Sequence, residues 1–252
     1  MKSVELFSYP NSPEIANQKA SQKLFTLINK VLKKDHPVLL LLSGGTWIPA
    51  LDESSLSGLE LNPNLNKLTI TTLDERVDNK AENNNFNKLL SSKNINTLIR
   101  LGAQVINTVP KNDENYFSFG DRINKSLKNY LFNHPQATLI ATAGVGGENN
   151  VPGHIAGIEP IEDVKEFTKK FLDPQKVYCG YSAKKLIPES RATATFSLLD
   201  RVDHFILLIL NPEQKRKSLD LILSDDKVDL NIAPCVYFHN HSNTTIFTDI
   251  SK

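Results

Sequence analysis

The stretch PVLLLLSGGT (37–46) decides the fold class of this chain. Residues 37–42 form an apolar run with no alternation between apolar and polar positions. Such a run is typical of a strand that is buried on both faces, as strands are in the parallel sheets of α/β proteins. The run ends in Ser43-Gly44-Gly45-Thr46, which permits a tight loop before a short helix. We therefore expect a parallel strand whose carboxyl end opens into a glycine loop.

The same order of strand, loop and helix recurs along the chain. Apolar or alternating runs predict further strands at residues 4–9, 67–73, 137–144, 176–182, 191–199, 203–210, 235–240 and 244–249. Helical spacing and start signals predict helices at residues 11–34, 114–133 and 212–223. This alternation predicts an α/β fold with a mostly parallel sheet. Because no Gly/Ser linker or shift in composition divides the chain, we expect residues 1–252 to form one domain, with the Asn-rich segment 79–88 as a solvated loop.

The composition excludes several classes of function. The 29 basic and 28 acidic residues leave a formal charge of +1, so no global field attracts nucleic acid or a membrane surface. Cys179 and Cys235 lie far apart and outside any CxxC spacing. We therefore expect neither a zinc site nor a disulfide framework, and a reducing, cytoplasmic location. No signal peptide is recognisable, and the apolar runs are too short to span a bilayer.

Four polar segments follow predicted strands or lie beside them, where ligands bind in open α/β sheets. The first is the SGGT loop, residues 43–46. Its glycines let backbone N–H groups approach an anion closely, and the start of the following helix adds a partial positive charge. The loop lacks the GxxxxGK[ST] and GxGxxG motifs, so a plain tight turn is the alternative to a phosphate-binding loop.

The second segment is Asp74-Glu75-Arg76, directly after the predicted strand 67–73. Charged side chains at the end of a buried strand are costly unless they are paired or functional. One interpretation is an ion-pair cluster that braces the loop. The other is a base or orienting carboxylate beside an arginine that binds an anionic substrate.

The third segment is GVGGENNVPGHIAGIEP (144–160). It begins with Gly144 and Gly146, and it contains His154 between two carboxylates, Glu148 and Glu159. A histidine in such a loop is either satisfied by local hydrogen bonds or part of an active site, and the segment alone leaves both interpretations open.

The fourth segment pairs two cations. Arg191 begins the predicted strand 191–199, and Lys215 lies in the first turn of the predicted helix 212–223. A cation near the N-terminus of a helix interacts unfavourably with the helix dipole. An anion bound at this position would compensate for that cost. Each cation taken alone is more often a solvated surface charge.

In this order, the four segments resemble the family of 6-phosphogluconolactonase and glucosamine-6-phosphate deaminase. That family combines an SGG-type phosphate loop, a DE-containing loop, a glycine-rich loop with Gly-His, and a late basic pair. The resemblance covers about residues 37–223. It implies a Rossmann-like α/β fold with helices on both faces of the sheet. It also implies a phosphorylated six-carbon sugar as ligand and no metal or organic cofactor. The sequence leaves the assembly open between a monomer and a homodimer.

More segments of the chain resemble the lactonase branch of the family than the deaminase branch. DERV (74–77), RATAT (191–195) with the later Lys215, and the ending APCVYFHNHSNTTIFTD (233–249) resemble the lactonase branch, and Asn85 fits an Asn of the family. In contrast, GHIAGIEP (153–160) resembles the deaminase Gly-His-Ile-Ala-Phe-Asn-Glu-Pro, whose catalytic Glu aligns with Glu159. The Gly-His loop is also longer than that of the family by about four residues, and Pro152 stands at the expected Asp.

The closer resemblance implies hydrolysis of 6-phospho-D-glucono-1,5-lactone to 6-phosphogluconate. His154 would be the general base that activates water, oriented by Glu148, and the backbone of residues 144–147 would hold the oxyanion. The phosphate would be held by Arg191, Lys215, Ser43, Gly44, Gly45 and Thr46. Arg76 would contact the substrate, and Asp74 would structure the site.

Two alternatives stay open at this point. In a deaminase or aldose–ketose isomerase, Asp74 would abstract a proton at sugar C2, and His154, supported by Glu159, would open the ring. In a paralogue that has lost catalysis, the same residues would bind a sugar phosphate and act as a sensor. The longer loop and Pro152 favour this last interpretation over the deaminase.

Overall fold

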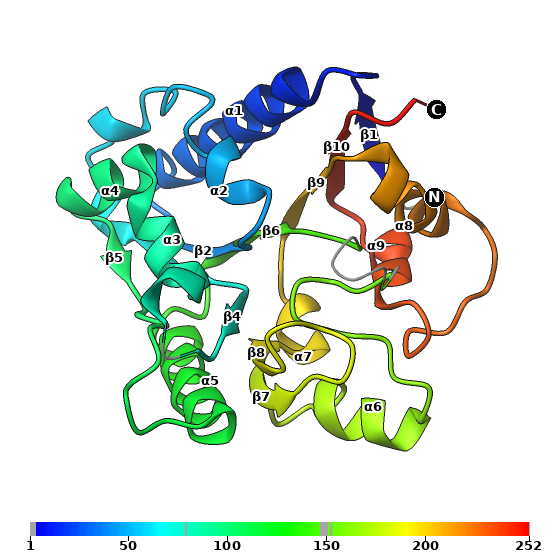
Figure 1. Cartoon of the computed structure of the whole chain (residues 1–252). Helices are drawn as coiled ribbons and strands as arrows, with labels where there is room; N and C mark the ends of the chain where they lie inside the picture. The colour runs from blue at the N-terminus through cyan, green and yellow to red at the C-terminus, as the bar shows by residue number, and fades with distance from the viewer. Residues whose placement is uncertain (1–3, 79, 147–150, 152, 252) are drawn as a thin grey trace.

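A seven-stranded sheet runs through the middle of the molecule (Figure 1), and all its neighbouring strands are parallel. The computed structural model describes residues 4–78, 80–146, 151 and 153–251. The strand order is β1-β10-β9-β6-β2-β3-β5. The strands are β1 Glu5–Ser8, β2 Val38–Leu42, β3 Leu68–Thr72, β5 Gln104–Val105, β6 Thr138–Ala143, β9 His204–Ile209 and β10 Thr244–Thr248. The buried parallel strand predicted at 37–42 is confirmed as β2, which is buried along its whole length.

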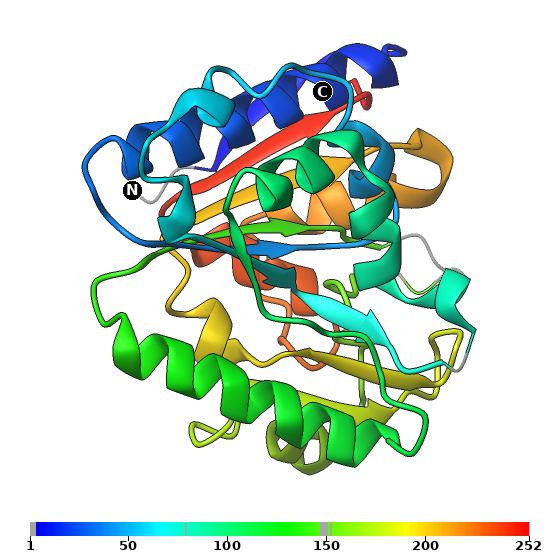
Figure 2. The same ribbon diagram turned by 90° about the vertical axis from the view of Figure 1, so that its left-hand side faces the viewer.

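A second, smaller sheet lies below the first (Figure 2) and is antiparallel, in the order β4-β8-β7. Its strands are β4 Asp74–Arg76, β7 Tyr178–Ser182 and β8 Ser190–Ala194. Segment 74–76, interpreted from the sequence as a loop, is therefore a short strand. It pairs with β8 in a register that places Asp74 opposite Thr193 and Arg76 opposite Arg191. This pairing brings two of the predicted polar segments together.

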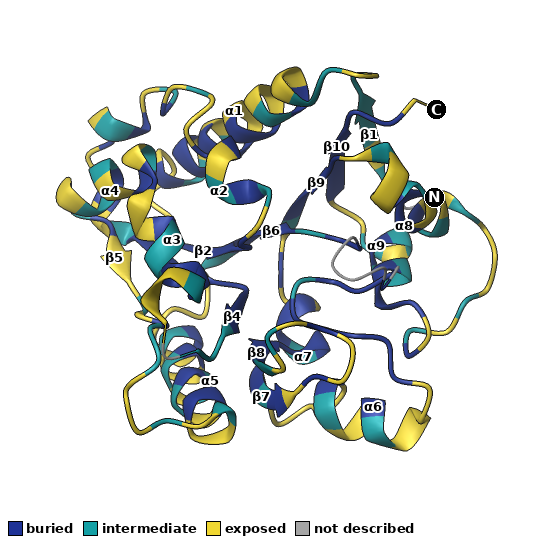
Figure 3. Cartoon of the chain, viewed as in Figure 1, coloured by how far each residue is buried: buried dark blue, intermediate teal, exposed yellow. Residues whose placement is uncertain are grey.

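Helices cover both faces of the large sheet, as the family resemblance predicts. The helices are α1 Pro13–Leu32, α2 Trp47–Ala50, α3 Asn85–Ser91, α4 Lys93–Arg100, α5 Tyr116–Asn133, α6 Val164–Phe171, α7 Phe196–Leu199, α8 Pro212–Leu223 and α9 Tyr237–Asn240, with short 3₁₀ turns at Leu59–Leu61, Leu65–Lys67, Ala81–Asn83 and Pro234–Val236. Their exposed residues face outward and their buried residues face the sheets (Figure 3). Among the described residues, no helix combines the length and apolar character that a membrane crossing requires.

The core has two halves, one on each face of the large sheet. Because side chains alternate along a strand, Leu40 and Leu42 of β2 pack with α1 and α4, whereas Leu39 and Leu41 pack with α5, α8 and the small sheet. Each fully buried leucine contributes about 1.5–3 kcal/mol relative to an exposed one. The unbroken apolar run of β2 is thus required by burial on both sides.

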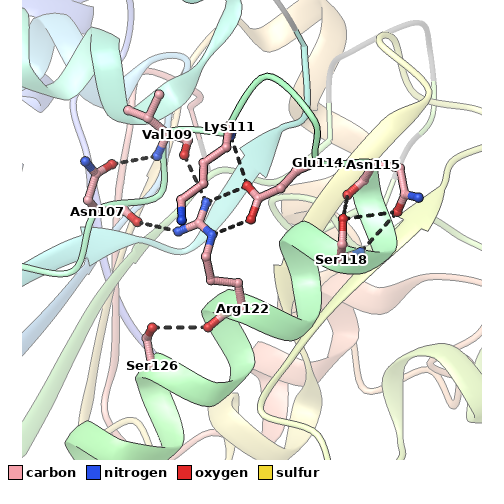
Figure 4. Close-up of polar contacts among 8 residues, drawn as sticks. All are labelled: Asn107, Val109, Lys111, Glu114, Asn115, Ser118, Arg122 and Ser126. Carbon is pink, nitrogen blue, oxygen red and sulfur yellow. Dashed lines mark hydrogen bonds and ion pairs between the residues drawn. The ribbon is translucent and has the colours of Figure 1, made fainter.

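The N-terminal half of α5 makes polar contacts with the segment before it (Figure 4) and packs against the small sheet. Asn115 caps the helix, and Arg122 makes two hydrogen bonds to Glu114, of 2.6 and 2.8 Å. The helix lies so close to β7 that a Cβ at Gly180 would be 1.6 Å from the carbonyl oxygen of Tyr116. This contact holds β7, and through it β8, in a fixed position.

Two strand predictions are wrong. The segment predicted as strand 191–199 is a strand only to residue 194, and its last four residues form α7. The segment 235–240 is not a strand but the end of a 3₁₀ turn followed by α9, because Pro234 favours a helix start and Phe238 packs edge-on against Phe205, with ring centroids 5.0 Å apart. A short apolar run does not distinguish these outcomes by periodicity.

The Asn-rich segment 79–88 also differs from the expected solvated loop. It contains a 3₁₀ turn and the start of α3, and both Asn84 and Asn85 are buried. Asn84 donates hydrogen bonds to the carbonyls of Arg76 and Asp78, so its polar side chain ties the segment to β4. Asparagine therefore serves here as a buried hydrogen-bonding residue.

Candidate active site

The four polar segments meet around one cavity of about 250 Å³. All the predicted site residues but two line it, namely Ser43, Gly44, Gly45, Thr46, Asp74, Arg76, Gly144, Gly146, His154, Arg191 and Lys215. The two others are Glu148, which lies outside the described residues, and Glu159. The cavity lies at the carboxyl ends of β2 and β6, where open α/β sheets bind ligands.

The SGGT loop is held to the neighbouring strand and to α3. Ser43 N donates a hydrogen bond of 2.9 Å to Thr142 Oγ1 at the end of β6. Gly44 allows the side chain of Asn85 to approach, since a Cβ at position 44 would lie 2.2 Å from Asn85 Oδ1. The short helix predicted after the loop is α2, which buries Trp47 completely. The loop is therefore a rigid wall of the cavity.

Asp74 is held between a cation and an amide. Its carboxylate lies 3.8 Å from Arg191 Nη1, and Asn85 Nδ2 donates to the backbone carbonyl and to Oδ2 of Asp74 at 3.0 and 3.3 Å. The side chain is almost fully buried but still lines the cavity. The arrangement combines the two interpretations of the DER segment, because Asp74 is both part of an ion pair and part of the site.

Glu75 has a different environment from its neighbours and does not line the cavity. Its fully buried carboxylate accepts hydrogen bonds from the backbone N–H groups of Arg76, Asn85 and Phe86. Burial raises the pKa of Glu75 to about 8, although the three N–H donors act in the opposite direction. Glu75 thus joins β4 to the first turn of α3 and positions Asp74 and Asn85 on either side.

His154 is fixed by its own backbone and by one ring nitrogen. Its carbonyl accepts a hydrogen bond of 3.0 Å from Gly146 N, beside a bridge between Val145 and Ile155. Ring atom Nδ1 lies 3.0 Å from the carbonyl oxygen of Val151. Because a carbonyl oxygen only accepts, Nδ1 carries the proton, and in the neutral ring the lone pair is on Nε2. The buried ring lines the cavity with the tautomer of a base acting through Nε2.

The expected oxyanion role of the 144–147 backbone does not extend to Gly146. The N–H of Gly146 donates to the carbonyl of His154, so this donor is already engaged, and Gly147 lies outside the described residues. Gly146 therefore positions the histidine instead of binding substrate charge.

Glu159 lies away from the cavity. Its fully buried carboxylate accepts hydrogen bonds from Lys184 N at 2.9 and 3.0 Å and from Lys185 N at 2.7 Å. These contacts hold the segment between β7 and β8. The structure thus does not bring Glu159 together with His154 at the cavity, in contrast to the arrangement that the deaminase resemblance implies.

The cavity carries a positive charge. Its charged lining residues are Asp74, Arg76, Arg191 and Lys215, together with a histidine that is counted as neutral. Arg191 is 2% exposed, and its Nε donates to the carbonyl of Pro188 while Nη2 donates to that of Ile187. Lys215 is 9% exposed and lies in the first turn of α8. Three cations against one carboxylate, all in a partly desolvated site, favour an anionic ligand.

The first turn of α8 contributes more to the cavity than Lys215 alone. Asn211 and Gln214 also line it. Asn211 has a left-handed backbone, with φ of 77°, and caps α8 by accepting a hydrogen bond from Gln214 N at 3.3 Å. Backbone N–H groups and the dipole at such a helix start favour an anion. The Asn-Pro pair that opens the helix is the signal in the sequence that points to Asn211, whereas Gln214 has none.

The described residues offer neither a cluster of metal-binding side chains nor an ionised thiol. In the described part of the chain, no group of three His, Cys, Asp or Glu side chains is close enough to hold a metal ion. Both cysteines are buried, and burial raises the pKa of Cys179 and of Cys235 to about 12, so that both thiols stay protonated near neutral pH.

The fold of the chain is similar to that of several solved structures. Three solved structures align with 98% of it, all of them 6-phosphogluconolactonases. They come from Plasmodium vivax (18% identity, TM-score 0.73, 91% of that chain covered), Trypanosoma brucei (17%, 0.74, 97%) and Shewanella baltica (16%, 0.73, 97%). At such identities the likeness shows a shared fold. No curated protein sequence matches the chain.

The family model described as "Glucosamine-6-phosphate isomerases/6-phosphogluconolactonase" matches residues 11–247. The match covers nearly the whole chain and confirms the resemblance drawn from the four polar segments. The chain therefore belongs to the family of glucosamine-6-phosphate isomerases and 6-phosphogluconolactonases.

Proposed function

We propose that the protein hydrolyses 6-phospho-D-glucono-1,5-lactone to 6-phosphogluconate. The observation that carries the proposal is a buried histidine with a protonated Nδ1 on the wall of a cavity that also holds Arg76, Arg191 and Lys215. The fold likeness to 6-phosphogluconolactonases supports the choice of substrate.

In the proposed reaction, His154 Nε2 takes a proton from a water molecule, and the water oxygen attacks the lactone carbon C1. The tetrahedral intermediate collapses with cleavage of the bond between C1 and the ring oxygen. The imidazolium of His154 returns its proton to that oxygen, which becomes the C5 hydroxyl. The new carboxylic acid then ionises at neutral pH, so that each turnover releases one proton.

The phosphate of the substrate is remote from the bond that breaks, and its role is positioning. Lys215, Arg191, the first turn of α8 and the SGGT loop bind it. Charge-assisted hydrogen bonds of this kind contribute about 1.5–3 kcal/mol each. Arg76 contacts the sugar acid portion, and Asp74 keeps Arg191 in place through their ion pair.

The test measures the release of protons from freshly prepared lactone by pH-stat titration. Purified protein is expected to accelerate release above the spontaneous rate, and His154→Gln to lower kcat by at least about 100-fold, the range of general base catalysis. The matched control is His239→Gln. His239 Nδ1 also bonds a backbone carbonyl, that of Ile222, but the residue does not line the cavity, so its variant should keep wild-type kcat. Full activity in His154→Gln would refute the proposed base.

The second candidate is deamination and isomerisation of glucosamine 6-phosphate, favoured by the family model and by the carboxylate of Asp74 on the cavity wall. Asp74 would then abstract the proton at C2. Release of ammonia together with fructose 6-phosphate, in the absence of lactone hydrolysis, would select this function. If neither substrate reacts and 6-phosphogluconate still raises the melting temperature, the protein is a sugar-phosphate-binding paralogue.

A further inference from the structure

We propose that Ser218 is a positioning residue for His154, acting through the backbone of the segment that carries the histidine. The inference rests on the proposed function, in which His154 is the base. Ser218 lies on α8, is fully buried and does not line the cavity. Its Oγ accepts a hydrogen bond of 3.1 Å from the N–H of Gly153, the residue directly before His154.

The same hydroxyl contacts the other side of the histidine segment. A Cβ at position 146 would lie 2.3 Å from Ser218 Oγ, so the hydroxyl packs directly against Gly146. Gly146 N in turn donates to the carbonyl of His154. One side-chain oxygen therefore touches both Gly146 and Gly153, the two backbone neighbours that fix the carbonyl and the amide side of the histidine.

Ser218 also links the histidine to the cationic part of the cavity. It lies three residues after Lys215 on α8, so the two residues share a face of the helix, and both are buried. Helix α8 is continuous from Pro212 to Leu223, and its N-terminal end lines the cavity through Asn211, Gln214 and Lys215. The bond from Gly153 N to Ser218 Oγ thus sets the position of His154 relative to the residues proposed to bind phosphate.

A second anchor keeps the segment folded when this bond is removed. Cys235 N donates a hydrogen bond of 2.8 Å to the carbonyl of Gly153, and this backbone contact does not depend on a side chain. Loss of the Ser218 hydroxyl is therefore expected to shift the histidine and leave the fold intact. Alanine is also a good helix former, so α8 itself is preserved in Ser218→Ala.

The kinetic test uses the lactone assay on Ser218→Ala. The expected result is a fall in kcat of about 10- to 100-fold, because a displacement of about 1 Å at a catalytic group has an effect of that size. KM should change by less than about twofold, since Lys215 and Arg191 are untouched. The matched control is Ser126→Ala on α5, whose hydroxyl bonds the carbonyl of Arg122 far from the cavity, and which should behave as wild type. An unchanged kcat in Ser218→Ala would overturn the inference.

A double-mutant cycle separates positioning from general structure. If Ser218 acts through His154, Ser218→Ala should lower the melting temperature equally in the wild-type and His154→Gln backgrounds but lower the rate only in the wild type. A rate loss of the same factor in both backgrounds would show that Ser218 acts independently of the histidine. Should Ser218→Ala fail to fold, Ser218→Cys keeps the shape of the side chain with a somewhat larger volume, weakens the acceptor and carries the same expectations.

An NMR measurement tests the inference without turnover. The imidazole signals of His154 in ¹⁵N-labelled protein should shift in Ser218→Ala and stay at wild-type positions in Ser126→Ala. Absence of lactone hydrolysis by the wild type would refute the proposed function but leave this readout valid. Identical His154 signals in wild type and Ser218→Ala would overturn the positioning role.

Discussion

The guanidinium of Arg191 on β8 lies 3.8 Å from the carboxylate of Asp74 on β4, and both side chains line the candidate active site. The same guanidinium donates to the carbonyls of Ile187 and Pro188. The guanidinium therefore links the end of the β7–β8 connection to the site. The single nitrogen of a lysine ammonium group cannot reproduce this planar set of donors.

Replacing Arg191 by lysine should impair substrate binding and stability together. Arg191→Lys keeps the charge but loses the fork, so we expect a decrease of about 1.5–3 kcal/mol in the free energy of unfolding and a rise in KM of about tenfold. Urea denaturation and lactone kinetics measure the two effects. Arg216→Lys, at a half-buried arginine of α8 outside the cavity, is the control, and a wild-type KM in Arg191→Lys would contradict the assignment.

Lys215 provides a cleaner test of phosphate binding, because α8 contains an exposed lysine two residues later. Lys215→Ala should raise KM by about 10- to 150-fold, the equivalent of one charge-assisted contact, with a smaller effect on kcat. Lys217→Ala removes the same charge from the solvent side of the helix and should leave KM unchanged. Equal KM values for the two variants would mean that only the overall charge of the helix matters.

The buried carboxyl of Glu75 predicts a pH dependence of stability. Its pKa in the folded protein is about 8 against an ordinary value of 4.5, so the folded state binds the proton more tightly than the unfolded state. The resulting stabilisation is complete below pH about 4.5 and is lost as the pH rises through 8. Melting temperatures from pH 5 to 8.5 should fall more steeply for the wild type than for Glu75→Gln.

The control for this pH effect is Glu82→Gln, which changes an exposed carboxyl of the neighbouring 3₁₀ turn and should follow the wild-type slope. If the curves of wild type and Glu75→Gln stay parallel over this pH range, Glu75 is ionised throughout, and its three N–H donors outweigh its burial.

Gly44 and Asn85 should respond to mutation as a pair. Gly44→Ala places a methyl group 2.2 Å from Asn85 Oδ1, so the amide must move away from Asp74, with an expected destabilisation of about 1–3 kcal/mol and a loss of activity. Shortening the partner in Gly44→Ala/Asn85→Ala should recover stability, though not the contact to Asp74. Calorimetry of the two single variants and the double variant measures this coupling, and additive losses would contradict it.

The family and the parallel sheet were predictable from the sequence because their signals are local. The unbroken run 37–42, the glycines after it and the helix start at Pro212 each depend on a few adjacent residues. The cluster of predicted residues at one cavity follows from a general rule, since parallel strands carry their loops to the same edge of the sheet. Nine strands were expected from such runs, and the late segments 191–199 and 235–240 show where a local pattern fails to separate strand from helix.

The remainder of the site depends on pairings between distant residues. The second sheet requires β4, only three residues long, to pair with β8 more than a hundred residues later, and no periodicity reveals this. Asp74 and Glu75 are adjacent in the sequence, but Asp74 lines the cavity whereas Glu75 accepts hydrogen bonds from the backbone of α3. The two differ because neighbouring side chains of a strand point to opposite faces. Glu159 shows a further limit of the sequence. It aligns with a catalytic Glu, but its carboxylate accepts a hydrogen bond from the backbone of Lys185 instead of lining the cavity.

The strand order has a consequence for synthesis on the ribosome. Strand β10, residues 244–248, lies between β9 and β1, so in the described part of the chain the edge strand β1 pairs with a strand that is synthesised more than two hundred residues later. Until β10 is made, β1 lacks this partner in the sheet, and α1 lacks one of the strands that it covers, the others being β9 and β2. The N-terminal thirty residues therefore complete their packing only after β10 has been synthesised.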